Sequence, residues 1–251
     1  CSGCSVSLMY AETPDLVEIL TSYISLSFHA TLSTATGEVA MDVLNHAIEH
    51  GEYVLVVEGS MPVGMPEACM LGAEPITTLV LRAARNADVV VSVGSCASFG
   101  GIPGAENNPT GAVSVATFLK NEHVIRPVIN LPGCPAHPDW TVGTLIHVLK
   151  FGFPILDSAG RPTMFYSRLI HDQCPRFSDY ERERFAKTFS DDGCLFKLGC
   201  LGPTTHADCT LRLWNGRTNY CIKASAPCIG CASHDFALRT SFPFYTNQPS
   251  G

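Results

Sequence analysis

The sequence predicts a mixed α/β protein with a parallel β-sheet over residues 1–150, followed by a loop-rich, mostly irregular or helical segment over 151–251. In the first part, short apolar runs rich in β-branched residues alternate with segments of helical spacing, as in a parallel sheet covered on both faces. In the second part this alternation fades, and Pro, Gly, Cys and single aromatic residues dominate. We therefore expect two domains with a boundary near residue 150.

Helices are expected at four places in the first part. Thr13 followed by Pro14 is typical of an N-cap and a first helical residue, and opens an amphipathic stretch that reaches Tyr23. Apolar residues recur with helical spacing in three further segments, residues 39–48, 76–83 and 140–149. Their apolar faces are expected to cover the sheet.

Three strands are expected, over residues 53–58, 88–93 and 128–131. Each is followed at once by an expected loop: Glu58-Gly-Ser60, Gly94-Ser-Cys96 and Pro132-Gly-Cys134. Ligands of open α/β sheets bind beyond the carboxyl ends of the strands. Cys96 and Cys134 should therefore meet at one sheet edge. With Cys1 and Cys4 brought to the same edge, we expect one site of four thiolates.

The second part begins with a linker, residues 151–170, containing an expected hairpin around Ser158-Ala-Gly-Arg161. The residues after it hold seven of the 12 cysteines and His171. Seven Cys and one His are enough ligands for two four-iron clusters. A segment with so little regular pattern can fold if metal ligation supplies the free energy that core burial does not.

The composition narrows the class of protein. Of 251 residues, 46% are hydrophobic and only 16% charged, with a net charge of −7, which excludes an intrinsically disordered chain. Because 16 Lys and Arg face 23 Asp and Glu, no basic excess points to nucleic acid. No run approaches the roughly 18 apolar residues of a transmembrane helix. No signal peptide is recognisable, and the compartment stays open between cytoplasm and periplasm.

The cysteine spacing favours metal ligation over disulfides or buried small side chains. Cys1 and Cys4, like Cys228 and Cys231, form C-x2-C pairs, in which one loop presents two soft ligands to one centre. The other short spacings are C-x5-C at Cys194 and Cys200 and H-x2-C at His171 and Cys174. Zinc modules usually place two C-x2-C pairs close together, and here no second pair lies near the first. Iron–sulfur clusters are the better interpretation.

Six motifs occur in order along the chain. They are Cys1-Ser-Gly-Cys4, Gly94-Ser-Cys96-Ala-Ser-Phe-Gly-Gly-Ile-Pro103, Pro132-Gly-Cys134-Pro-Ala-His-Pro, His171-Asp-Gln-Cys174-Pro, Cys194 with Gly199-Cys200-Leu-Gly-Pro203, and Pro227-Cys228-Ile-Gly-Cys231. Together they resemble the small, electron-transferring subunit of a nickel–iron hydrogenase over essentially the whole chain. The resemblance implies a flavodoxin-like first domain and an iron–sulfur second domain.

The resemblance also implies three clusters, which pass electrons between a nickel–iron centre in an obligate large subunit and an external redox partner. Cys1, Cys4, Cys96 and Cys134 match a proximal [4Fe–4S] cluster. His171, Cys174, Cys194 and Cys200 match a distal [4Fe–4S] cluster, near which a further electron-transfer protein would dock. Cys209, Cys228 and Cys231 match a medial cluster. Many members have a [3Fe–4S] cluster there, but Cys221 stands near the fourth position and predicts [4Fe–4S].

Other interpretations predict different properties. A cluster-bearing subunit of a complex-I-like quinone reductase would share the α/β half, but would have adjacent cysteines in place of the first pair and no counterpart of the C-terminal ligands. A stand-alone ferredoxin-like carrier would need no second chain. A zinc-binding interaction module is a fourth alternative. Oxygen-tolerant members carry two extra proximal cysteines, whose places are taken here by Gly3 and Gly101.

The remaining candidate residues receive weaker assignments. Cys69 is expected to be a buried small hydrophobic residue. Glu58, at a strand end, would contact the proximal cluster, contact the partner, or have a structural role. Ordinary polar packing is expected for three histidines near the cluster loops, His137, His206 and His234. Trp140 and Trp214 are expected to anchor the core or an interface.

Overall fold

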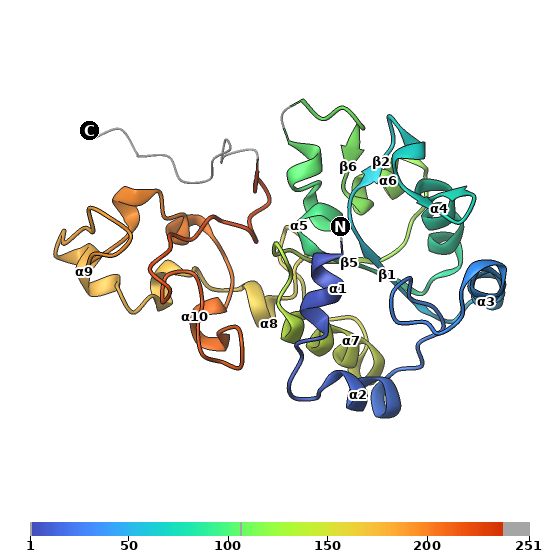
Figure 1. The fold of residues 1–251 in the computed structure, drawn as a ribbon, viewed down its shortest axis with the longest axis horizontal. Helices are drawn as coiled ribbons and strands as arrows, with labels where there is room; N and C mark the ends of the chain where they lie inside the picture. Colours follow the sequence, from blue (N-terminus) through green and yellow to red (C-terminus); the bar gives the residue numbers. More distant parts are fainter. Residues whose placement is uncertain (1, 106, 238–251) are drawn as a thin grey trace.

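A three-stranded parallel sheet lies at the centre of the first part of the chain. The computed structural model describes residues 2–105 and 107–237 (Figure 1). The sheet contains β1 (Val54–Glu58), β5 (Val89–Val93) and β7 (Val128–Leu131) in the order β1-β5-β7. Val54 pairs with Val89 and Val90 with Val128, all in parallel register. The three strands expected from the sequence are confirmed.

Both faces of the sheet are covered, which explains its apolar sequence. In the central strand, Val90 packs against a cluster built from α4 (Ile76–Asn86) and α6 (Val115–Asn121). Val91 and Val93 face the opposite way and pack with Trp140 of α7 (Pro138–Phe151). The helices expected over 76–83 and 140–149 are confirmed and extend beyond those ranges. This alternation of period two is the signature of a strand buried on both sides.

The outer elements complete the first part. The helix α3 (Gly37–His50) packs Ile48 against Leu79 and Ala83 of α4, so the third expected helix is also confirmed. Two small antiparallel pairs and two 3-10 helices lie between the main elements: β2 (Met61–Pro62) with β6 (Ala112–Val113), β3 (Met70–Leu71) with β4 (Glu74–Pro75), η2 (Pro66–Ala68) and η3 (Ile102–Gly104).

Two local expectations are wrong. The first helical stretch, α2 (Leu16–Glu18) continued by the π-helix η1 (Ile19–Tyr23), is capped by Asp15 and not by Thr13. The Asp15 carboxylate accepts a 2.8 Å hydrogen bond from the Glu18 N–H, which makes Pro14 lie before the cap. The expected loop at Gly94 is the start of α5 (Gly94–Phe99), because Gly94, at φ +86°, turns β5 directly into a helix.

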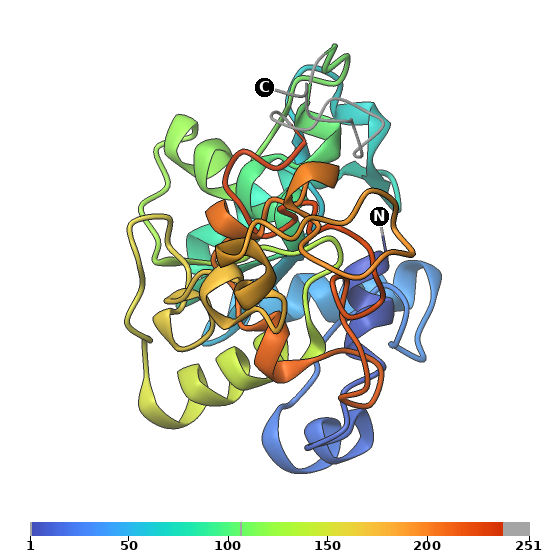
Figure 2. The same ribbon diagram turned by 90° about the vertical axis from the view of Figure 1, so that its left-hand side faces the viewer.

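The second part has short helices joined by irregular segments; it lies beside the sheet domain in Figure 1 and in front of it in Figure 2. The expected hairpin is confirmed: Leu156 pairs with Pro162, and the Asp157 N–H donates to the Arg161 carbonyl at 2.9 Å. The helices that follow are α8 (Thr163–Tyr166), η4 (His171–Gln173), α9 (Phe177–Glu181), η5 (Phe196–Leu198), η6 (Gly202–Thr204) and α10 (Cys209–Arg212). Over residues 171–237, strand pairing is limited to isolated bridges.

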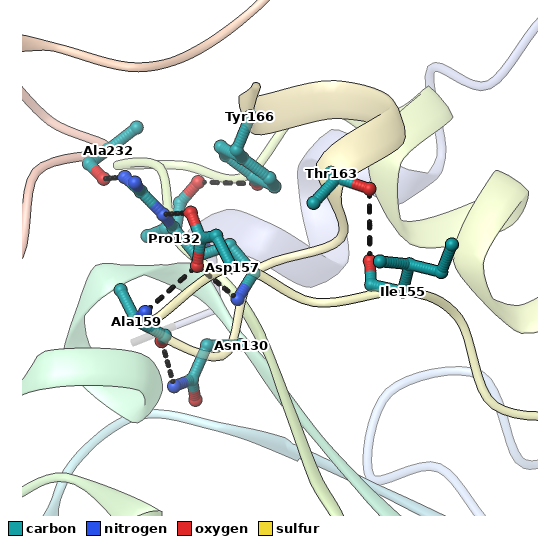
Figure 3. Close-up of polar contacts among 9 residues, drawn as sticks. Asn130, Pro132, Ile155, Asp157, Ala159, Thr163, Tyr166 and Ala232 are labelled. Atoms are coloured by element: carbon teal, nitrogen blue, oxygen red, sulfur yellow. Dashed lines mark hydrogen bonds and ion pairs between the residues drawn. The ribbon is translucent and has the colours of Figure 1, made fainter. Parts of the chain in front are cut away.

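The two parts share one hydrophobic cluster. It includes Ile129 and Leu131 of β7 together with Phe165, Tyr166 and Ile222 of the second part. Figure 3 shows the polar contacts at this junction: Asn130 donates to the Ala159 carbonyl at 2.9 Å, and the Tyr166 hydroxyl to the Pro132 carbonyl at 2.9 Å. Among the helices of the described residues, none combines the length and the apolar character required to cross a membrane.

Candidate metal centres

Three cysteines of the first part meet where β5 and β7 end, as the sequence predicts. Cys4 comes from α1 (Gly3–Leu8), Cys96 from the first turn of α5, and Cys134 from the segment after β7. Cys96 and Cys134 lie near enough to Cys4 for their charges to raise its pKa. These three residues are called the proximal group below. Cys1, the fourth expected ligand, lies outside the described residues.

Glu58 holds the first cysteine loop against the end of β1. Its carboxylate oxygens accept 3.0 Å hydrogen bonds from the N–H groups of Cys4 and Ser5, and a 2.6 Å bond from the Ser5 hydroxyl. The Nδ1 atom of His29 accepts from the N–H groups of Thr31 and Leu32, so its Nε2–H is left to face the Ser5 hydroxyl at 3.2 Å. Glu58 therefore has the structural role that the sequence left as one of three possibilities.

Burial of the proximal thiols disfavours their charged thiolate form. Burial, with smaller effects of Glu58, Cys134 and Cys96, raises the pKa of the Cys4 thiol to about 12, although the Ala136 N–H hydrogen bond opposes this. Burial also raises the pKa values of Cys96 and Cys134. A thiolate in such a place needs a cationic centre to stabilise it, and binding that centre releases the thiol proton.

The four residues expected to hold a distal cluster line one cavity. His171, Cys174, Cys194 and Cys200 all lie in the wall of one small cavity in the second part of the chain. The His171 ring is fixed edge-on against Tyr180 and Phe177, with centroid distances of 4.6 and 5.0 Å. These four residues are called the distal group.

Polar groups of the second part are aimed at the distal group. The Arg176 N–H donates to Cys174 Sγ at 3.4 Å, while the Arg176 guanidinium donates to the Gly193 carbonyl at 2.8 Å. The buried Tyr220 hydroxyl has no oxygen or nitrogen partner among the described residues, and burial, followed by the charge of Cys174, raises its pKa. A buried hydroxyl donor beside the thiols fits a site in which a bound group would supply a hydrogen-bond acceptor.

Four of the five remaining cysteines form a medial group: Cys209, Cys221, Cys228 and Cys231. Burial raises the pKa of Cys209 far above its usual value, and the charges of Cys231, Cys228 and Cys221 add to that effect. Burial likewise raises the pKa of Cys231 to about 12, with contributions from Cys221 and Cys134. Cys221 is thus a neighbour of the other three, as expected for a fourth ligand.

The three groups follow one another in space and touch through their ligand residues. The Cys134 backbone N–H of the proximal group lies close enough to the Cys231 sulfur of the medial group to lower the pKa of that thiol. The Cys228 N–H of the medial group donates to Cys200 Sγ of the distal group at 3.4 Å. Adjacent groups are therefore neighbours in space, and the order is proximal, medial, distal.

The residues present fit iron–sulfur clusters by their chemistry and by the space around them. Nearly all donors are thiols, the ligands that iron–sulfur clusters take. A Cβ atom at Gly94 would lie 2.5 Å from Cys4 Sγ, and one at Gly101 would lie 2.9 Å from Cys96 Sγ, so both glycines keep the cradle open. Within residues 2–105 and 107–237, no three His, Cys, Asp or Glu side chains converge on the position of a single ion. Ligands of a four-iron cluster stand farther apart than those of one tetrahedral ion, whose bonds to sulfur are about 2.3 Å.

Cys69 lies outside all three groups, and the expectation that it is buried is wrong. Its side chain is exposed at the end of η2. Its backbone carbonyl accepts the Ile76 N–H at 2.9 Å, so this position serves a turn and not the core.

The other histidines and tryptophans have structural roles in the described residues. His137 caps α7 by accepting the Asp139 N–H at Nδ1, and its Nε2 donates to the Leu213 carbonyl at 2.6 Å. Trp140 is fully buried and donates to Asp208 at 2.7 Å. The rings of Trp214 and His137 lie 4.5 Å apart. His206 pairs with Leu169 in an isolated bridge, and His234 packs against Phe99.

Ser95 is a residue of the site that no sequence pattern singled out. It is buried at the start of α5, accepts the Gly133 N–H at 2.9 Å and donates to the Cys231 carbonyl. Its place beside Cys96 was visible in the sequence, but the contact spans 136 positions.

Two protein-family models match the chain, and they meet near the point where the sequence pattern changes. Residues 1–148 match the family model described as NADH ubiquinone oxidoreductase, 20 Kd subunit. Residues 166–245 match the model of the C-terminal part of the NiFe/NiFeSe hydrogenase small subunit.

Individual relatives match over nearly the whole chain. The periplasmic [NiFeSe] hydrogenase small subunit of Desulfomicrobium baculatum is 41% identical over 99% of this chain and 84% of its own length. The hydrogenase-2 small chain of Escherichia coli K12 is 39% identical over 92% of this chain and 64% of its own. A solved structure of the Desulfomicrobium baculatum [NiFeSe] hydrogenase aligns with a TM-score of 0.92 at 40% identity, covering 99% of this chain and 95% of the other.

Proposed function

Since the chain belongs to the family of NiFe and NiFeSe hydrogenase small subunits, we propose that it conducts electrons between the nickel–iron site of a large subunit and an external redox partner. Hydrogen is oxidised, or protons are reduced, at the large-subunit site. When bound, iron–sulfur clusters supply one-electron carriers whose potentials depend on charge, hydrogen bonds and exposure. The observation that carries the proposal is the series of three cysteine-rich groups, in which the Cys134 N–H lies near the Cys231 sulfur and the Cys228 N–H donates to the Cys200 sulfur.

The ligand sets are proposed as the sequence predicted them. Cys1, Cys4, Cys96 and Cys134 would hold the proximal [4Fe–4S] cluster, and His171, Cys174, Cys194 and Cys200 the distal one. Cys209, Cys221, Cys228 and Cys231 would hold a medial [4Fe–4S] cluster, because Cys221 lies within the electrostatic reach of its three neighbours. A flavodoxin-like domain over residues 1–150 and a cluster domain over 151–251 are the proposed division of the chain.

Metal and sulfide analysis of the complex tests the cluster count. The chain, purified with its large subunit, should contain about twelve irons and a similar number of sulfides per small subunit. Fewer than about ten irons would contradict three four-iron clusters. The same purification tests the partner: recovery of the fully loaded chain without any nickel protein would favour a stand-alone carrier.

The role of Cys221 has its own test. In the variant Cys221→Ala the medial cluster should lose one iron and give the EPR signal of a three-iron cluster after mild oxidation. The matched control is Cys69→Ala, which removes an exposed thiol outside the three groups. A three-iron signal already present in the unaltered complex would contradict the fourth medial ligand.

The alternative of a complex-I-like quinone reductase subunit rests on the family model that matches residues 1–148. That half alone does not separate the two families, because both share it. The C-terminal match over residues 166–245, with the distal and medial groups inside it, favours the hydrogenase assignment. Reduction of a quinone by the complex without any hydrogen-dependent activity would reverse this preference.

The large subunit is proposed to cover the surface around α1. Val6, Met9 and Tyr10 are 49%, 52% and 71% exposed, although they are apolar or aromatic and lie within a few residues of Cys4. Such a patch beside a metal centre is a reasonable partner surface, because exposed clusters of large apolar side chains are uncommon on monomers. Val6→Asp should weaken co-purification of the large subunit, whereas Val39→Asp, at an equally exposed residue of α3, should not.

An external electron-transfer protein is proposed to dock near the distal group. Phe196 lines the distal cavity and is 36% exposed, so this cavity lies near the surface. The name of the Desulfomicrobium baculatum relative favours the periplasm among the two compartments that the sequence left open. Fractionation of cells that make the complete precursor would decide between them.

A further inference from the structure

The proximal and medial groups meet at the loop that contains Cys231. The Cys231 sulfur lies near the backbone N–H of Cys134, a residue of the neighbouring group. The Cys231 carbonyl accepts the hydroxyl of Ser95, which directly precedes Cys96. One residue of the medial group is therefore in contact with both proximal loops.

These contacts form a bridge from Gly133 through Ser95 to Cys231. The Ser95 hydroxyl accepts the Gly133 N–H at 2.9 Å, and the Gly133 carbonyl accepts the Ser95 N–H at 2.9 Å. Gly133 is covalently joined to Cys134 of the proximal group, and the Ser95 hydroxyl donates to the carbonyl of Cys231 in the medial group. Ser95 therefore bridges the two groups, and this bridge sets how far apart Cys134 and Cys231 lie.

The chemistry of the position requires a small hydroxyl. Ser95 is 1% exposed, so no solvent can replace a lost hydrogen bond there. A serine hydroxyl offers one donor and two acceptor positions, and here it uses the donor for a carbonyl and an acceptor for an N–H. Alanine would leave both of these buried backbone groups without a partner, the costly way to lose a hydrogen bond.

A second tie reaches the same loop from the hairpin. The Arg161 guanidinium donates to the carbonyl of Ala232, the residue after Cys231, at 3.1 Å (Figure 3). Asp157 fixes that guanidinium through a 2.8 Å ion pair, and Arg161 is 8% exposed. The hairpin is itself bonded to β7 through Asn130 and Gly160. Two buried donors of different origin thus locate one short piece of medial loop.

We propose that Ser95 is a positioning residue that fixes the separation of the proximal and medial clusters, with Arg161 as a second and weaker tie. This inference rests on the proposed function, because it concerns the gap between two of the proposed carriers. Electron transfer falls steeply with distance, so a bridge that fixes this gap also fixes the rate at which electrons pass between the two groups.

The test compares Ser95→Ala with Ser98→Ala in the purified complex with the large subunit. Ser98 is a matched control: it is 2% exposed on the same helix, and its hydroxyl donates to Ser92 within the sheet domain at 3.1 Å. After full reduction, the EPR spectrum should show magnetic splitting between proximal and medial clusters in the unaltered complex and in Ser98→Ala. In Ser95→Ala this splitting should be lost or strongly changed at the same iron content.

Arg161→Lys keeps the test decisive if Ser95→Ala does not load its clusters. Lysine can retain the ion pair with Asp157, but it lacks the planar guanidinium that donates to Asp157 and to the Ala232 carbonyl at the same time. A smaller change in the same splitting is therefore expected. An unchanged splitting in Ser95→Ala at full iron content overturns the proposal. So does an unchanged splitting in Arg161→Lys when Ser95→Ala is unloaded. A complex without clusters even in its unaltered form would instead contradict the proposed function.

Discussion

The two parts of the molecule hold their cysteines by different means. In residues 2–150, the cysteines follow or begin regular elements, and the sheet between them is closed by fully buried side chains such as Val90, Val91 and Ile129. In residues 151–237, no helix exceeds five residues and strands are replaced by isolated bridges. We expect the core of the first part to fold without its metal. The second part arranges its ligands through turns, buried polar contacts and, by inference, the clusters themselves.

Removal of iron should have the largest effect, and it should affect the two parts differently. In the iron-free complex, amide hydrogen exchange should stay slow in β5 and β7 and become fast over residues 171–231. Structural metal sites can contribute on the order of 10 kcal/mol to the folding of a small domain, which the short helices here cannot replace. Equal loss of protection in both parts would show that the sheet also depends on the clusters.

Gly94→Ala should have the next largest effect, confined to the first part. A Cβ atom at this position would meet Cys4 Sγ at 2.5 Å. The variant should lose about four irons, those of the proximal cluster, while its sheet stays folded. Gly59→Ala is the control, since Gly59 has a similar φ of +92° but no atom within 4 Å of an added Cβ. Both variants carry a left-handed strain of about 1–2 kcal/mol. Equal iron content in the two variants would contradict the steric argument.

A substitution of His137, which contacts Leu213 of the second part, should have a smaller effect on stability that depends on pH. Burial lowers the pKa of His137 below 6.5, although the Leu213 carbonyl opposes this shift. Below about pH 6.5 the unfolded chain therefore binds more protons at this residue than the folded chain, and stability falls as the pH falls.

The measurement is thermal unfolding between about pH 7.5 and about pH 5. His137→Asn keeps a side chain that can cap α7 but removes the titrating group, so its melting temperature should fall less steeply on acidification. A slope identical to that of the unaltered complex would show that other groups carry the acid sensitivity.

Cys69→Ser should have the smallest effect. The side chain is exposed and belongs to none of the three groups, so the expected change in the free energy of unfolding is below about 0.5 kcal/mol. Iron content and EPR spectra should be unchanged. A loss of iron in this variant would mean that the cysteines were divided wrongly among the groups.

The strands and most helices of the first part could be predicted because the spacing of their apolar residues is visible within each segment. The runs that became β1, β5 and β7 need only their own residues to reveal a strand buried on both faces. The cap at Asp15 and the helix at Gly94 were missed, because Thr13 and Asp15 are both good caps and only the approach of Cys4 explains the turn at Gly94. The exposure of Cys69 was not predicted either, since its backbone carbonyl makes the turn contact and the type of side chain does not reveal such a contact.

By itself, the sequence predicted cysteines and one histidine as metal ligands, and its short spacings predicted which neighbouring thiols one loop presents together. It also placed Cys96 and Cys134 at one edge, because parallel strands end on the same side of a sheet. Only the tertiary structure decided how the groups meet: Cys134 against Cys231, Cys228 against Cys200, and Ser95 across 136 positions. Such contacts depend on how separate segments pack, and no local period records which N–H will face which sulfur.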